Sequence, residues 1–262
     1  MTQTLRLLDD KVVLVSGGTQ GVGAAVAGAA VRAGARVAIT GRRAEVGGAL
    51  TSELTAAGGE VVFLPADVAD VPQAQESVAK TVERFGQVDC LVNSAGLTSR
   101  GTLLDTTQEL FDAHIAVNLR GPFFLMQAVV RDMLRRKSPG TIVNIISASQ
   151  HAGQPYLAPY VAAKSGLAGL TRNAAHAHRW DRIRINGLNI GWTQTEGEDV
   201  VQRTFHDADD RWLAQAGASL PMGKLGQVDE IADFVIFLLS DRSGVVTGSV
   251  IDWDQNVVGG LD

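Results

Sequence analysis

The 262-residue chain has a single cysteine, no long apolar run and no excess of basic residues. Because Cys90 is the only cysteine, no intrachain disulfide can form, which fits a protein of the reducing cytosol. A cysteine-rich zinc site is excluded for the same reason. Apolar stretches such as 234–239 are far too short to cross a bilayer. Because 23 lysines and arginines face 28 aspartates and glutamates, neither nucleic acid nor an anionic membrane is expected as the main partner.

Targeting and metal-binding patterns are also missing. Charged side chains interrupt the first eleven residues, so this segment does not have the pattern of a signal peptide. His176 and His178 stand two positions apart on an expected helix, so their rings would not share a face, and no acid stands at ligand spacing. We therefore expect a soluble, cytoplasmic protein without a metal site.

Short β-branched runs alternate with longer alanine-rich stretches, without a linker or a repeat. Most of the expected strands are apolar throughout, as in sheets covered by helices on both faces. The alternation predicts one α/β domain, residues 1–262, built on a doubly wound parallel sheet. The expected strands are 12–16, 36–40, 61–66, 90–93, 141–146, 183–189 and 249–252. The expected helices are 21–33, 44–57, 72–85, 107–137, 159–180 and 229–239.

The segment 193–224 interrupts this alternation with a polar, acidic stretch that follows Trp192 and contains Trp212. It comes after an expected strand, so it would lie at the carboxyl edge of the sheet, where ligands bind in open α/β folds. We expect it to form a lid over the substrate. The alternative is an ordinary pair of surface helices.

A glycine-rich turn follows the first expected strand and opens the first expected helix. Gly17, Gly21 and Gly23 give the spacing Gly-x-x-x-Gly-x-Gly. Glycines at such a turn let the backbone approach a pyrophosphate, which rests on the N-terminus of the helix. The turn therefore predicts a dinucleotide site, although a βα turn without a ligand would share the pattern.

The end of the second expected strand reads Gly41-Arg42-Arg43 and carries no acidic residue. An acid here would bind the ribose 2′-hydroxyl of NAD, whereas an arginine accommodates the 2′-phosphate of NADP. A guanidinium can pair with a phosphate through two parallel hydrogen bonds, so Arg42 favours NADP over NAD. Otherwise the two arginines are only the solvated start of a helix. Gln20, in the glycine turn, adds no second cation.

Tyr160 and Lys164 stand four residues apart on an expected helix, and Ser147 precedes them. That spacing places the phenol and the ammonium one turn apart on the same face. A nearby cation lowers a tyrosine pKa toward neutrality, where general acid–base catalysis works best. The pair could move a proton to or from an oxygen that Ser147 also holds. Taken alone, it is more often a surface tyrosine and lysine.

The motifs occur in this order along the chain: the glycine turn, Asn93-Ser94-Ala95-Gly96, Asn118, Ser147, Tyr160 and Lys164. Together they resemble the short-chain dehydrogenase/reductase family over essentially the whole chain. The resemblance implies a Rossmann-type sheet of about seven strands, a homotetramer, and reversible hydride transfer between NAD(P) and a carbonyl or secondary alcohol. Tyr160 would be the general acid/base, while Lys164 would lower its pKa and hold the nicotinamide ribose. Ser147 would orient the substrate oxygen, and Asn118 would hold a water of a proton relay.

The resemblance also implies which residues contact the cofactor. Asp67 would hydrogen-bond the adenine amino group. The implied contacts are Gly17, Gln20, Gly21, Val22, Gly23, Arg42, Asp67, Val68, Asn93, Ala95, Gly96, Tyr160, Lys164, Ile190 and Thr193. Where the family has Pro-Gly after the sixth strand, this chain has Ile190-Gly191-Trp192, and the loss of proline relaxes the path of the chain into the lid.

The pocket for the alcohol or carbonyl substrate is expected to be polar. Its candidates are Gln150, His151, Gln154, Tyr156, Trp192, Thr195 and Glu196. Such a set favours a small hydroxylated molecule, such as a polyol or a sugar, over a steroid or a fatty acyl chain. His151 could tune binding or the response to pH, or it could be exposed and idle. The competing hypothesis is a catalytically silent NAD(P)-binding sensor or scaffold, which would be expected to lack one of the four proton-transfer residues.

Overall fold

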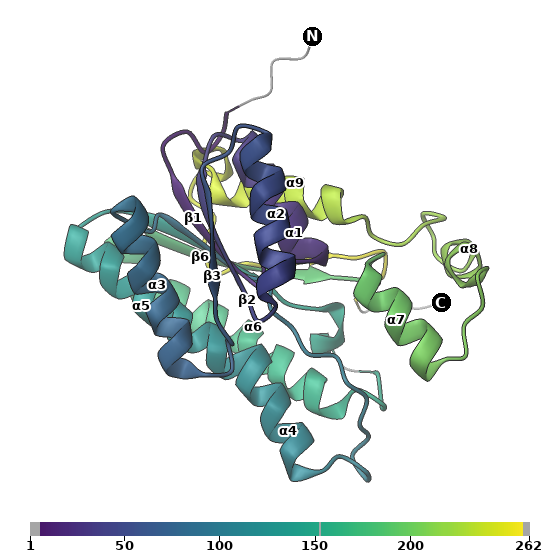
Figure 1. Cartoon of the computed structure of the whole chain (residues 1–262). Helices are drawn as coiled ribbons and strands as arrows, with labels where there is room; N and C mark the ends of the chain where they lie inside the picture. The colour runs from purple at the N-terminus through teal and green to yellow at the C-terminus, as the bar shows by residue number, and fades with distance from the viewer. Residues whose placement is uncertain (1–5, 152, 259–262) are drawn as a thin grey trace.

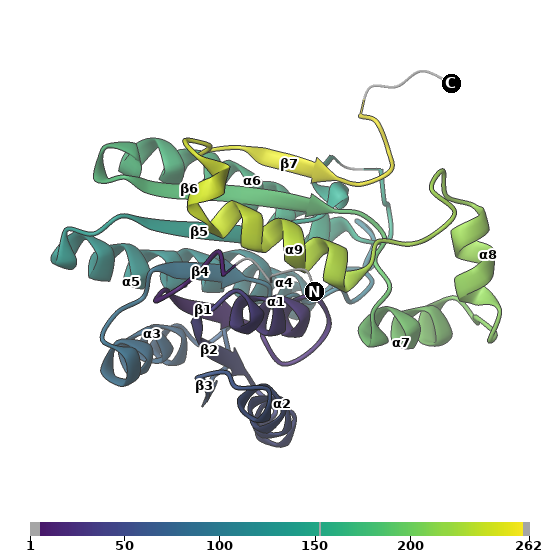
Figure 2. The ribbon, with the colours of Figure 1, turned by 90° about the horizontal axis from the view of Figure 1, so that it is seen from above.

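A seven-stranded parallel sheet runs through the computed structural model, which describes residues 6–151 and 153–258 (Figure 1). Its strand order is β3-β2-β1-β4-β5-β6-β7, seen in Figure 2 from β7 at the top to β3 at the bottom. The strands are β1 (Val12–Ser16), β2 (Arg36–Gly41), β3 (Val61–Pro65), β4 (Cys90–Asn93), β5 (Gly140–Ile145), β6 (Ile183–Ile190) and β7 (Val250–Trp253). The predicted doubly wound parallel sheet is confirmed.

Helices cover both faces of the sheet (Figure 1). One face carries α1 (Gly21–Arg32), α2 (Ala44–Ala56) and α9 (Val228–Leu239); the other carries α3 (Val71–Phe85), α5 (Gly121–Arg136) and α6 (Ala158–His178). Alternate residues of β1 enter the two cores, because side chains of a strand point to opposite faces. Val13 and Val15 pack with α1 and α9, whereas Val12 and Leu14 pack with α3 and α5, and all four are fully buried.

The helix expected over 107–137 is interrupted. It divides into α4 (Gln108–Ile115), a π turn (Ala116–Arg120) and α5. Pro122 has no N–H and cannot donate the α-helical hydrogen bond to the carbonyl of Asn118, so the ladder is broken where the π turn stands. Asn118 lies inside this turn and is fully buried. Single π turns within helices are frequent at functional sites.

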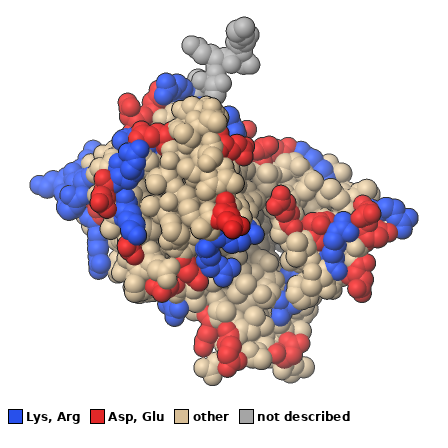
Figure 3. Space-filling view, viewed as in Figure 1, with Lys and Arg blue, Asp and Glu red and all other residues tan. Residues whose placement is uncertain are grey.

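The segment after β6 forms two helices, α7 (Glu196–Phe205) and α8 (Trp212–Ala218). They stand apart from the sheet at its carboxyl edge, and a hollow separates them from the body of the molecule (Figure 3). A cleft of about 1230 Å³ lies between these helices and α1 and α2. The lid predicted for 193–224 has the required place in the fold; that it covers a substrate stays a prediction.

Membrane and metal sites were expected to be absent. In residues 6–151 and 153–258, no helix has the length and the apolar character that a membrane span needs. The same residues include no group of three or more His, Cys, Asp or Glu side chains that could hold a metal ion. Residues 1–5, part of the segment judged above for a signal peptide, lie outside the described residues, as do 152 and 259–262 of the predicted domain.

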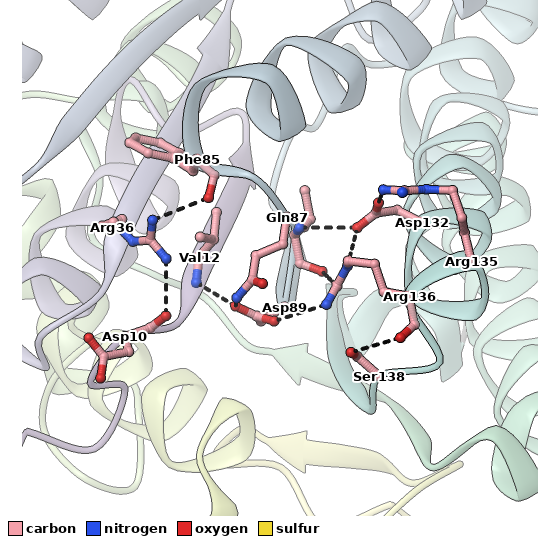
Figure 4. A network of polar contacts seen from close by, with 11 residues as sticks. Asp10, Val12, Arg36, Phe85, Gln87, Asp89, Asp132, Arg135, Arg136 and Ser138 are labelled. Carbon is pink, nitrogen blue, oxygen red and sulfur yellow. Dashed lines mark hydrogen bonds and ion pairs between the residues drawn. The ribbon is translucent and has the colours of Figure 1, made fainter.

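An ion network closes the amino edge of the sheet (Figure 4). Asp132, on α5, accepts hydrogen bonds from Arg135 at 2.6 Å and Arg136 at 2.8 Å. Arg136 also lies 3.7 Å from Asp89, which in turn accepts the backbone N–H of Val12 at 2.9 Å. Burial acts to raise the pKa of Asp132, but the two arginines and the Val88 N–H together outweigh it and lower that pKa. The network ties α5 to the starts of β1 and β4.

We expect Asp132→Ala to lower the free energy of unfolding by about 3 kcal/mol, because it leaves the nearly buried Arg136 short of a carboxylate. Urea denaturation measures the change. Glu76→Ala is the matched control, since Glu76 forms an i,i+4 pair with Lys80 in which the side chains are 58% and 50% exposed. That variant should lose about 0.5 kcal/mol or less. Equal losses in the two variants would contradict this account of the network.

Candidate active site

The site begins where the ends of β1 and β4 meet. Ser16 is paired with Asn93, and the N–H of Ser94 donates to the Ser16 carbonyl at 2.9 Å. The strand order reverses between these two strands, which leaves a crevice at their carboxyl ends. Asn93 donates to Asn144 at 2.8 Å, while its own Oδ1 is buried without a partner among the described residues. A buried acceptor of this kind suits a ligand that donates a hydrogen bond.

The glycine turn is packed closely against this crevice. A Cβ on Gly17 would lie 2.5 Å from the nitrogen of Ala95, and one on Gly23 would lie 2.1 Å from the Gly17 carbonyl oxygen. Gly21 has φ +53°, and the space above it is open apart from Thr195 at 3.5 Å. The first backbone N–H groups of α1 face this opening without helical partners, as a pyrophosphate requires. The residues present therefore fit a dinucleotide.

Arg43, rather than Arg42, reaches the glycine turn. Its guanidinium donates to the side-chain oxygen of Gln20, and both residues line the cleft between α1 and α2 on one side and α7 and α8 on the other. Arg42 is exposed directly after β2. The sequence thus predicted one arginine at this edge, whereas the structure places a second cation against the turn. The adjacent position of Arg43 in the sequence was the available signal, but only the fold brings it to Gln20.

The other predicted cofactor contacts lie at the carboxyl ends of neighbouring strands. Asp67 follows β3, and its Oδ1 accepts the N–H of Ala69 at 3.0 Å. Val68 comes next and packs against the start of α5. Ile190 ends β6, and Thr193 is buried after it. Val22 is buried in the first turn of α1 and Gly96 lies beside Asn118, so the structure brings the predicted contacts to one edge of the sheet.

Asn118 is held rigidly by three hydrogen bonds. Its Oδ1 accepts the N–H of Leu97 at 3.0 Å, and its Nδ2 donates to the Leu97 carbonyl at 2.9 Å and lies 3.2 Å from Nδ1 of His114. Nε2 of His114 lies 3.1 Å from the carbonyl of Ser99, which assigns the proton to Nε2. Burial lowers the pKa of this histidine. Sequence reasoning missed His114, although its i,i+4 spacing from Asn118 was visible.

Tyr160 and Lys164 lie on one face of α6 and are 9% and 4% exposed. The Lys164 ammonium is 5.6 Å from the centre of the Tyr160 ring and donates to the Ile145 carbonyl at 2.8 Å. Burial lowers the pKa of Lys164 from its ordinary 10.5 to about 8. A cation taken out of water thus stands directly beneath the phenol.

The structure does not show the lowered tyrosine pKa that the sequence predicts. Burial raises the pKa of Tyr160, Ser147 acts to lower it, and the more distant charges of Glu198 and Arg100 act in opposite directions. The physical reason is burial, which disfavours the charged phenolate, while the Lys164 ammonium donates its hydrogen bond to the Ile145 carbonyl and not to the phenol oxygen. In this arrangement the phenol is held neutral.

Ser147 and one of the predicted substrate residues belong to the same chain of hydrogen bonds. The Ser147 hydroxyl donates to that of Ser149 at 3.0 Å and accepts the Ser149 N–H at 3.2 Å. The hydroxyl of Ser149 in turn donates to the side chain of Gln154. Gln154 is therefore connected to Ser147 and close to the reacting position.

His151 and Gln150 are engaged elsewhere. His151 lies 2.8 Å from Asp252, on β7, and Gln150 lies 3.0 Å from the same imidazole. Asn189 donates to Asp252 at 2.7 Å, which completes a cluster on the β6–β7 side of the site. In the structure His151 is therefore held by Asp252 of the last strand, and it is not brought to Ser147.

Trp192 connects the end of β6 to α7 and α8. Its Nε1 donates to Glu198 at 2.7 Å, and its ring lies 6.3 Å from that of Trp212, which donates to Asp199 at 2.7 Å. Thr195 caps α7 by accepting the N–H of Glu198 at 3.0 Å. This threonine also faces Gly21, so it lies on the cofactor side as well as on the predicted substrate side. The cap, three residues before a glutamate, was the signal for its position.

Residues 17–256 match the family model described as Enoyl-(Acyl carrier protein) reductase. The chain belongs to the short-chain dehydrogenase/reductase family. It is 36% identical to an "Uncharacterized oxidoreductase" of Thermotoga maritima, over 93% of this chain and 96% of that protein. It is 35% identical to an "L-rhamnose 1-dehydrogenase (NAD(P)(+))" of Azotobacter vinelandii, over 93% and 94%. A solved variant of an actinorhodin polyketide ketoreductase with NADPH is 31% identical, with a TM-score of 0.89 over 94% of this chain and 96% of that one.

The identification made from the sequence is therefore confirmed, and this member of the family is an NAD(P)-dependent oxidoreductase. Nothing in the comparisons favours the silent sensor.

In this oxidoreductase, Lys164 is charged in both the folded and the unfolded protein below about pH 8, but only in the unfolded protein between about pH 8 and its ordinary pKa of 10.5. The unfolded state then binds more protons, so stability rises with pH across that window. Lys164→Met lacks the buried ammonium, so its free energy of unfolding should exceed that of the wild type at low pH. We expect this difference to shrink by about 3 kcal/mol across the window.

Urea denaturation of both proteins at about pH 7 and about pH 10 measures the difference. Lys80→Met is the control, because Lys80 is 50% exposed on α3 and should keep the wild-type profile. Parallel profiles for Lys164→Met and the wild type would show that the ammonium is not buried as described.

Proposed function

We propose that this oxidoreductase interconverts a small carbonyl compound and its secondary alcohol, with Tyr160 as the general acid/base. The observation that carries the proposal is the convergence of Tyr160, Lys164 and Ser147 at the carboxyl edge, beside the glycine turn. A bound nicotinamide supplies or accepts the hydride. The protein supplies orientation and the proton.

In the direction of reduction, the Tyr160 hydroxyl gives its proton to the substrate oxygen as negative charge develops there. In the proposal the Ser147 hydroxyl turns from Ser149 and donates its hydrogen bond to the same oxygen, which fixes the position of that oxygen. Because burial keeps the phenol neutral, the proton is in place before the reaction begins. The Lys164 ammonium beneath the ring then stabilises the phenolate that is left.

Reprotonation of Tyr160 requires a path to solvent. Asn118 lies in the π turn, where Pro122 leaves its carbonyl without the α-helical donor. In the proposal this carbonyl accepts a hydrogen bond from a water molecule, and that water passes a proton toward Lys164. The three side-chain bonds to Leu97 and His114 hold the asparagine in place for that role.

We also propose the organisation predicted from the sequence: one domain, a lid at 193–224, a homotetramer and a cytoplasmic location. Exposed apolar side chains, such as Phe237 on α9 at 39%, support packing against further copies. The polar residues near Ser147, with the similarity to a rhamnose dehydrogenase, support a small hydroxylated substrate.

Tyr160→Phe should lower kcat/KM by about a thousandfold, because it removes the proton and keeps the ring. NADPH binding, followed by calorimetry, should change by no more than about threefold. Tyr156→Phe, at the only other tyrosine, is the matched control and should keep most of the activity. Wild-type protein that binds NADPH but reduces no carbonyl compound would support the sensor instead.

We propose NADP as the favoured cofactor, with its 2′-phosphate held by Arg42 and by Arg43 beside Gln20. Calorimetric titration should show tighter binding of NADP than of NAD. Arg42→Ala and Arg43→Ala should each weaken NADP binding by about tenfold and NAD binding by about threefold or less. Arg84→Ala, on α3 and paired with Glu60, is the control. Tighter binding of NAD by the wild type would contradict the proposal.

A further inference from the structure

Arg100 stands at the mouth of the site, in the loop after β4. The next residue, Gly101, forms an isolated parallel bridge with Leu157, and its N–H donates to the Tyr156 carbonyl at 2.9 Å. This pairing fixes the loop beside the segment that leads into Tyr160. The Arg100 guanidinium lies 5.3 Å from the centre of the Tyr156 ring and 5.8 Å from that of Phe205, at the end of α7.

The hydrogen bonds of Arg100 are incomplete. One terminal nitrogen donates to the Thr98 carbonyl at 3.0 Å, and the other lies 3.2 Å from Nε2 of His206. Its Nε is buried without a partner, and no carboxylate lies within 4.0 Å of the guanidinium in the part of the chain that the structure describes. A buried donor without a partner is unusual and calls for an acceptor.

Two other arginines that are largely shielded from solvent have a full set of hydrogen-bond or ion-pair partners. Arg184 donates to two main-chain carbonyls, at 3.2 and 2.9 Å, and to the hydroxyls of Thr141 and Ser243. Arg136 is paired with two carboxylates at the amino edge. Arg100 has only the Thr98 carbonyl and the His206 imidazole as partners and no carboxylate among the described residues, and its loop is paired with the segment that leads into Tyr160.

Arg100 is also the uncompensated charge at this face of the site. Burial dominates the raised pKa of Tyr160, with Glu198 acting to raise it and Arg100 to lower it, so both charges lie within reach of the phenol. The Glu198 carboxylate already receives hydrogen bonds from Trp192 and Gln202, both at 2.7 Å. The positive charge of Arg100, by contrast, has no carboxylate beside it among the described residues and is bonded only to the Thr98 carbonyl and the His206 imidazole.

We propose that Arg100 binds a carboxylate carried by the substrate, at the end away from the reacting carbon. A planar guanidinium donates two parallel hydrogen bonds to a carboxylate, and the free Nε of Arg100 would donate one of them. The Tyr156 and Phe205 rings would flank the chain between the two ends. The proposal rests on the function proposed above, and it narrows the substrate from a neutral polyol or sugar to a small hydroxy or oxo acid.

The alternative role for Arg100 is structural. Through His206 and Phe205 it joins the body of the protein to the end of α7 and could act only as a latch for the lid. A latch would affect acidic and neutral substrates alike, whereas a carboxylate site would affect only the acids.

The test compares 4-oxopentanoate, 5-oxohexanoate and 6-oxoheptanoate with their methyl esters as substrates for NADPH oxidation. Each ester keeps the carbonyl and removes the charge. In the wild type, at least one acid should have a kcat/KM about tenfold above that of its ester. Arg100→Met should remove that preference by lowering turnover of the acid, with the ester within about threefold of wild type, and Arg100→Lys should fall between the two.

Arg211→Met is the matched control, because Arg211 lies just before α8, is 78% exposed and is paired with Asp209. It should leave the acid preference unchanged. Equal turnover of acids and esters by the wild type, or an equal loss of both in Arg100→Met, would overturn the proposal.

A binding measurement separates this proposal from the proposed function. Hexanoate should bind the NADP-loaded wild type about tenfold more tightly than hexanamide by calorimetry, whether or not any compound is turned over. Equal binding of the two would overturn the carboxylate site. The proposed function fails instead if no acid, ester or neutral ketone is reduced. If Arg100→Met does not fold, the comparison of hexanoate with hexanamide on the wild type still decides the question.

Discussion

An ammonium buried at the carboxyl edge of the sheet is the constraint on which the site depends. Lys164 is 4% exposed, and its hydrogen bond goes to the Ile145 carbonyl at the end of β5. Removing a cation from water is unfavourable, and here it lowers the lysine pKa to about 8. The two apolar cores on either face of the sheet stabilise a fold that tolerates this cost. A protein selected only for stability would place an apolar side chain at this position.

Hydrogen bonds between buried side chains connect α6, which carries Lys164, to the crevice between β1 and β4. Asn93 donates to Asn144 at 2.8 Å, and Asn144 donates to Thr171 at 2.9 Å, so β4, β5 and α6 are joined by one chain of polar contacts. Such contacts are strong in a low dielectric. The ion network around Asp132 fixes the opposite edge. The strands are thus held at both ends, and the ends that carry the chemistry are set with little freedom.

The fold was largely predictable because most of its strands are rich in apolar residues and are separated by helices, a pattern typical of a parallel sheet covered on both faces. The π turn at Asn118 was not predicted, since the apolar pattern of 107–137 continues through it. Pro122 signals a break, but the form of the break depends on contacts with Leu97 that only the fold creates. Contacts between segments that are far apart in the sequence could not be predicted either. The placement of Arg43 against Gln20, and of Arg100 against Tyr156, requires segments that are far apart in the sequence.

The expected effect of Lys164 on Tyr160 shows a further limit. Helical spacing correctly indicates that two side chains share a face, but it says nothing of burial or of the carbonyl that competes for the ammonium. The structure supplies both, and together they leave the phenol neutral and the lysine close to losing its proton.

The titration of Lys164 itself tests this account most directly. Lysine side chains labelled with ¹³C at Cε report their own protonation by NMR, and the Lys164→Arg variant identifies the signal. The account predicts that this lysine titrates at about 8, well below the ordinary 10.5. A titration of Lys164 above about 10 would contradict it.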